Sequence, residues 1–180
     1  NTSGHACAVA LSGTHLYVAD GVAGIRVVNV ANPASPSLAG AFHTAGPARA
    51  VTISGATAYV LDEHQGLLVL DISNPGAPSL MGSYAGVSAG QSLAVSGPRA
   101  CIVDGNNHFL VVDVSSPATP VLTGSLLLDN TVGQAVLQDG STAYVAAGGS
   151  GLLVIDVSTP AAPMLVSTIL MPGEATALAL

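Results

Sequence analysis

Short apolar runs alternate with polar stretches along the whole chain, and Gly and Pro separate the runs. In residues 50–84, four runs at 50–54, 58–61, 67–72 and 79–84 are rich in Val, Ile, Leu and Tyr. Runs of this length, bounded by turn residues, are typical of β-strands, and no apolar repeat of three to four residues persists to indicate a helix. The pattern predicts four short strands here and an all-β fold.

This four-strand pattern is repeated. The stretch GLLVLDISNPGAPSLMG begins at Gly66, and related stretches begin at Gly24, His108 and Gly151, so the period is 42 or 43 residues. A fixed period near 40 residues with Gly and Pro at constant positions indicates a solenoid or a propeller. We expect one domain over residues 1–180, with units at about 3–44, 45–86, 87–129 and 130–171, while 172–180 begin a fifth.

The run at 67–72 is apolar at successive positions, so both faces of its strand must be covered. Radially stacked antiparallel sheets provide such cover. We therefore predict a β-propeller of four-stranded blades, with about four blades plus one extra inner strand aligned at 177–180. Such a partial ring would leave two apolar blade faces free, which predicts further blades in a longer chain or self-association into a larger ring.

The third strand of the units reads LLVLDIS, FLVVDVS and LLVIDVS, and this core resembles the LVIVD repeat family. Asn29 in place of Asp and His108 in place of Gly are departures that leave the pattern intact. The resemblance implies a β-propeller in a bacterial or archaeal protein that is secreted or held at the cell surface. It implies no catalytic residues.

Composition narrows the function. The net charge is −7, Lys is absent, and Arg26, Arg49 and Arg99 are the only Arg residues, so nucleic acid binding and anionic membrane surfaces are disfavoured. No apolar run is long enough for membrane insertion. Cys7 and Cys101 are too few for a disulfide framework, and we expect two free, buried thiols.

Candidate binding residues lie where the units differ. One rim of the predicted propeller holds repeated Ser-Gly and proline turns, whereas the loops of the other rim vary, and variable loops on a rigid frame commonly bind ligands. The repeat alignment also places a ring of inner-strand residues near the channel mouth on this rim. We predict that the variable rim contacts a protein or a glycan through these residues: Arg49, Glu63, His64, Gln91, Asn106, Asn107, His108 and Gln134.

Metal binding and catalysis are the alternatives. Two His near carboxylates could hold a divalent cation, but the spacing matches no zinc signature. Asp20, Asp62 and Asp104 share one repeat position, where capping of a hairpin is favoured over calcium binding. Common enzyme motifs are absent. We therefore predict a non-enzymatic module without a cofactor; the alternatives are a lyase or hydrolase with a metal over the channel and a purely structural spacer.

Overall fold

The computed structural model describes residues 4–129 and 131–179 and shows sixteen strands. No helix that could span a membrane is found among these residues. Residues 1–3, 130 and 180, at which some of the predicted units and the fifth inner strand begin or end, lie outside them. The strands are β1 (Ala8–Ser12), β2 (His15–Ala19), β3 (Ile25–Asn29), β4 (Ser37–Phe42), β5 (Ala48–Ser54), β6 (Thr57–Asp62), β7 (Gly66–Asp71), β8 (Ser79–Tyr84), β9 (Ser92–Ser96), β10 (Arg99–Val103), β11 (His108–Asp113), β12 (Val121–Leu127), β13 (Ala135–Asp139), β14 (Thr142–Ala146), β15 (Leu152–Asp156) and β16 (Met164–Ile169).

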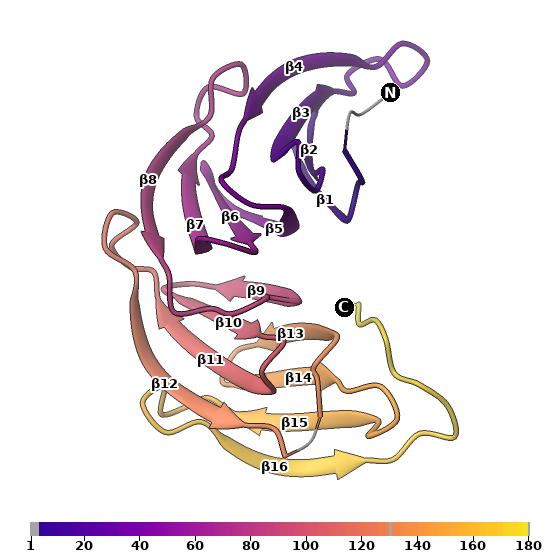
Figure 1. Ribbon diagram of the computed structural model, residues 1–180, viewed down its shortest axis with the longest axis vertical. Helices are drawn as coiled ribbons and strands as arrows, with labels where there is room; N and C mark the ends of the chain where they lie inside the picture. The colour runs from indigo at the N-terminus through magenta and orange to yellow at the C-terminus, as the bar shows by residue number, and fades with distance from the viewer. Residues whose placement is uncertain (1–3, 130, 180) are drawn as a thin grey trace.

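The strands form four antiparallel sheets, each made of four strands in chain order. We call the sheets blade 1 (β1–β4), blade 2 (β5–β8), blade 3 (β9–β12) and blade 4 (β13–β16). Figure 1 shows the blades along an open arc, with β1, β5, β9 and β13 innermost and blades 1 and 4 at its two ends. The predicted all-β propeller architecture is confirmed, and the ring is not closed.

The core consists of three apolar clusters, one between each pair of successive blades. Strand β7 explains why the repeated core is apolar at successive positions. Leu67 packs toward blade 3 and Leu68 packs toward blade 1, and both are fully buried. The expectation that this strand is covered on both faces is therefore confirmed.

The Asp that ends the third strand of a blade holds the following proline turn. Asp71, Asp113 and Asp156 each accept a hydrogen bond at 2.7–2.8 Å from the backbone N–H two residues later. These bonds lower the pKa of the three carboxyl groups, because they favour the charged form. In blade 1, Asn29 accepts the same bond from Ala31 at 2.9 Å. The predicted turn role is confirmed for this position.

A glycine in the outer strand lets the next blade approach. A Cβ atom on Gly82 would lie 2.5 Å from the carbonyl oxygens of Pro117 and Ala118, which belong to the proline turn of blade 3. Gly40 and Gly124 meet the turns of blades 2 and 4 in the same way. Blade 4 has Ser167 at this register position, where no described blade follows.

The start of the predicted fifth unit is only partly formed. Ala175 pairs with Gly148 of blade 4, as Ala48 pairs with Gly21 of blade 1. Residues 176–179 then run on without pairing to a strand, although we predicted an inner strand there. The physical reason is that an inner strand is held by the second strand of its own blade, which no described residue provides. Leu178 and Ala179 instead line one hollow together with Leu137, Tyr144 and Leu152 of blade 4.

Candidate binding rim

The candidate residues come from two loops and from the beginnings of three inner strands. Glu63 and His64 lie in the β6–β7 loop, while Asn106 and Asn107 precede β11 and His108 begins it. Arg49 lies in β5, and Gln91 and Gln134 come immediately before β9 and β13. The candidate residues therefore lie in loops and at the starts of inner strands, as the repeat alignment predicts, and each of these segments is attached to a four-stranded sheet.

A β-bulge presents Arg49. The register of β5 against β6 shifts between Ala48 and Ala50, so Arg49 has no partner residue opposite it and its side chain is 52% exposed. Bulges of this kind redirect a side chain away from the regular alternation of a strand. The bulge accounts for an exposed cation at the beginning of a strand whose neighbouring residues are buried.

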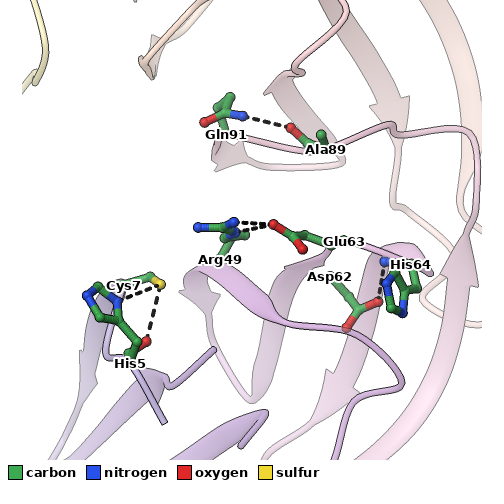
Figure 2. Close-up of polar contacts among 8 residues, drawn as sticks. All are labelled: His5, Cys7, Arg49, Asp62, Glu63, His64, Ala89 and Gln91. Atoms are coloured by element: carbon green, nitrogen blue, oxygen red, sulfur yellow. Dashed lines mark hydrogen bonds and ion pairs between the residues drawn. The ribbon is translucent and has the colours of Figure 1, made fainter. Parts of the chain in front are cut away.

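Arg49 forms an ion pair with Glu63 across the β5–β6 hairpin. Its Nε donates a 2.5 Å hydrogen bond to Oε1 of Glu63, and a terminal nitrogen contacts the same oxygen (Figure 2). The bond to Glu63 raises the pKa of Arg49, although partial burial acts in the opposite direction. An exposed pair contributes only about 0.2–1 kcal/mol to stability. Its clearest effect is to hold two opposite charges in a fixed place on the rim.

Cys7 and His5 lie beside Arg49. Together with Gly4, Gly21, Val22 and Pro47, these three residues line a hollow at the inner edge of blades 1 and 2. The Cys7 thiol donates to the His5 carbonyl oxygen at 3.2 Å, and its Sγ lies 3.7 Å from Nδ1 of His5. Figure 2 shows Cys7, Arg49 and Gln91, which come from three successive blades.

One thiol prediction is wrong and the other is confirmed. Cys7 is exposed, because it lies at the start of the inner strand, a position that is also exposed in the other three blades, at Arg49, Gln91 and Gln134. Cys101 is buried between blades 3 and 4 and donates to Gln138 Oε1 at 3.3 Å. Burial raises the pKa of Cys101 to about 12, although the nearby Arg99 lowers it. Both cysteines are free.

The two thiols should react very differently. At pH 8 a thiol with a pKa near 12 has about one thiolate in ten thousand, and the thiolate is the nucleophile. We expect iodoacetamide to modify Cys7 in the folded protein and Cys101 only after unfolding in urea, as peptide mass spectrometry would show. Cys7→Ser should remove all labelling of the folded chain. Equal labelling rates for the two cysteines would contradict the buried position of Cys101.

Asp62 anchors the β6–β7 loop. Its buried carboxylate accepts hydrogen bonds from the backbone N–H groups of His64 at 2.9 Å and Gln65 at 2.7 Å, and from Gly46 at 2.9 Å. His64 itself donates from Nδ1 to the Ala45 carbonyl oxygen at 3.3 Å. The predicted capping role is confirmed for Asp62, and this carboxylate fixes Glu63 and His64 in place.

Asp104 has the same role in the β10–β11 loop. Its Oδ1 accepts from the N–H groups of Asn106 and His108, both at 2.9 Å, and lies 3.5 Å from Nδ1 of His108. Asn107 adopts a positive φ of 64°, and its carbonyl oxygen accepts a 2.7 Å bond from Leu128. These hydrogen bonds fix the loop backbone, and with it the positions from which the side chains of Asn106, Asn107 and His108 extend.

Asp20 departs from the capping prediction. It is fully buried, and its Oδ2 accepts a 3.2 Å bond from the N–H of Gly4 rather than from its own hairpin. Its Oδ1 has no partner among the described residues. The hairpin is closed instead by backbone bonds, from Asp20 N–H to the Gly24 oxygen and from Ala23 N–H to the Asp20 oxygen. The short loop from Asp20 to Gly24 bends back without a side-chain cap.

The structure does not join the two histidine loops into one cluster. His64 contacts Ala45 within blade 2, and His108 contacts Asp104 within blade 3. Among the described residues no three His, Cys, Asp or Glu side chains are grouped as a metal site would require. The two loops belong to different blades of a radial array. Their similar composition therefore does not bring their side chains together into one site.

The two glutamines stay near their own blades. Gln91 Nε2 donates to the Ala89 carbonyl oxygen at 3.0 Å. Gln134 lies over the β14–β15 loop, since a Cβ added to Gly148 would lie 3.1 Å from its Nε2. Sequence reasoning missed His5 as a neighbour of Arg49, because the equivalent residue of blade 2 is Pro47 and no repeated feature marks the position.

Comparisons with solved structures agree with this fold. The computationally designed Ika4 protein matches with a TM-score of 0.72 and 15% identity over 86% of this chain and 92% of that one. The computationally designed Ika8 protein matches with a TM-score of 0.73 and 15% identity over 96% of this chain and 50% of that one. The Cps50 (Swd1) β-propeller domain of Myceliophteria thermophila gives 0.69 and 10% identity over 91% and 58%.

The matched part of the chain thus spans 50% of the Ika8 protein and 58% of the Cps50 domain. No curated protein matches the sequence. The family profile described as LVIVD repeat matches four times, at residues 3–44, 45–86, 89–127 and 135–170. Since these matches cover most of the chain, the protein belongs to the LVIVD repeat family.

Proposed function

We propose that this β-propeller is a non-enzymatic binding module that contacts a protein or a glycan through its variable rim, outside the cell or at its surface. The observation that supports this most strongly is the arrangement around Arg49. A bulge exposes its guanidinium, Glu63 holds it, and the buried Asp62 fixes the loop that carries Glu63. Polar groups that are held in place before binding lose less conformational freedom on binding.

The chemistry of the rim suits a polar ligand. Arg49 and Glu63 offer a paired cation and carboxylate, while Gln91, Asn106 and His108 add donors and acceptors on the neighbouring blade. Sugar hydroxyls and polar protein surfaces both provide the complementary donors and acceptors. No described grouping of side chains supports the alternative of a metal-dependent lyase or hydrolase, so we do not propose it.

The test is a variant in which the rim is altered and the frame is kept. We expect Arg49→Gln combined with Glu63→Gln and His64→Ala to weaken binding at least tenfold, which equals a loss of about 1.4 kcal/mol. Ligands would first be identified with the unmodified protein on a glycan array and an array of secreted proteins, and dissociation constants would then be measured by calorimetry. Thermal unfolding would show that the variant remains folded.

A matched control lies on the opposite, repeated rim. His15 and Asp139 flank the inner turns of blades 1 and 4, and we expect His15→Ala with Asp139→Asn to leave the dissociation constants unchanged. A ligand that binds the rim variant as tightly as the unmodified protein would contradict the proposal. So would a ligand that is lost only with the control variant.

A further inference from the structure

Blade 1 has an apolar face that no described residue covers. Val9 and Leu11 of β1 are 60% and 63% exposed. Their equivalents in blade 2 are Val51, which is only 7% exposed, and Ile53; both pack against blade 1. The inner strand of blade 1 therefore presents on its free face the same kind of residue that elsewhere lies inside a junction between blades. The third strand differs, because Arg26 occupies the position that the buried Leu68 has in blade 2.

Blade 4 has the opposite apolar face free. Tyr144, Leu152 and Val154 are partly exposed, whereas the equivalent Tyr17, Ile25 and Val27 of blade 1 are buried against blade 2. At this end Ile169 is also 47% exposed, while the equivalent Phe42 packs into the first junction. The arc thus ends in the two complementary halves of one repeated junction.

We propose that a second copy of this chain binds these two faces, so that blade 4 of each copy packs on blade 1 of the other. Both contacts then have the arrangement of the junction between blades 1 and 2, with Arg26 in the place of Leu68. The result is a closed ring of two half-rings, and a total of eight blades lies within the range that propellers adopt. The proposal does not depend on what the rim binds.

The area is sufficient for a stable dimer. A blade face of four strands, each about 17 Å long and about 4.8 Å from the next, measures about 300 Å². Two junctions with two faces each bury about 1,200 Å², which reaches the range of stable specific interfaces, about 1,200–2,000 Å². The second copy also adds its own Cys7, Arg49, Gln91 and Gln134 positions, so that the inner ring of the rim runs around the whole axis.

Two features of blade 4 weaken this contact. Residues 178 and 179 form one wall of a hollow lined by Leu137, Tyr144 and Leu152, where the inner strand of the second copy would pack. Ser167 replaces the glycine that elsewhere admits the proline turn of the following blade. Removing residues 176–180, or changing Ser167→Gly, should therefore tighten the dimer about tenfold.

The test measures the mass of the 180-residue chain in solution. Sedimentation equilibrium between about 1 and 100 µM should show a dimer of twice the 17.6 kDa chain mass. Val9→Glu should raise the dissociation constant at least a hundredfold, because it places a charge within the junction. Leu38→Glu is the matched control and should leave the dimer intact, since Leu38 is 64% exposed and its equivalent Leu80 remains 47% exposed inside the arc.

Three results would overturn the proposal. The first is a monomer at 100 µM for the full chain, for the chain lacking residues 176–180 and for Ser167→Gly. The second is equal dissociation constants for Val9→Glu and Leu38→Glu, with circular dichroism showing both folded. The third is a series of larger oligomers that grow with concentration, because a closed ring of two copies leaves no free face.

Discussion

Replacing Leu67 with alanine is expected to lower the free energy of unfolding by about 2–5 kcal/mol. Leu67 is fully buried between blades 2 and 3, and its neighbours in that cluster, such as Leu110 and Val112, come from another sheet. The substitution removes apolar contacts and leaves a cavity that two separate sheets would have to move to fill. Urea denaturation followed by circular dichroism gives the change directly.

The control for Leu67→Ala is the same repeat position at the end of the arc. Leu152 pairs with Ile169 as Leu67 pairs with Tyr84, but Leu152 is only partly buried. In dilute protein, we expect Leu152→Ala to lower the free energy of unfolding by about 1 kcal/mol. Equal losses at the two positions would mean that the outer face of blade 4 is covered as fully as an interior junction, contrary to the open arc.

Gly82→Ala, which adds a single methyl group, should have the next largest effect and lower the free energy of unfolding by about 1–3 kcal/mol. The new Cβ would lie 2.5 Å from two carbonyl oxygens in the proline turn of blade 3, and a backbone turn moves less easily than a side chain. The outer edges of blades 2 and 3 would have to separate. Thermal and urea unfolding of the variant measure the cost.

The control for Gly82→Ala is Ser167→Ala in blade 4. This position already carries a Cβ, it is exposed, and no described blade follows it, so we expect a change within about 0.5 kcal/mol. If Gly82→Ala were equally harmless, the close approach of the proline turn would not determine the residue at this position. The repeated glycine would then need another explanation.

The architecture was predictable because the same pattern of apolar and turn residues recurs in every unit. Residues that are apolar at successive positions, such as Leu67 and Leu68, demand cover on both sides of one strand, and only a few arrangements of antiparallel sheets provide it. The turn residues indicated where the strands end, since Asp71 and Pro75 together end the third strand. Repetition made these local signals consistent with one another.

The rim was harder to predict, because its contacts depend on small departures from the repeat. Arg49 lies at a β-bulge, and no residue type in the sequence indicates that bulge. Cys7 occupies the equivalent inner position, and it is exposed because this position is exposed in all four blades, whatever residue occupies it. His64 and His108 share similar loops, yet each bonds within its own blade. Loop composition predicted the face on which these residues lie, and it could not predict which of them meet.

The separation of the core into three clusters has a consequence for how the molecule comes apart. Each cluster joins one blade to the next along the chain, so the energetics resemble a row of coupled units in which only adjacent members interact. Blades 2 and 3 are clamped from both sides, while blades 1 and 4 are held from one side. In dilute protein, where the chain is monomeric, thermal fraying is therefore expected to start at the two termini, and the central pair should be the last to lose its native hydrogen-exchange protection.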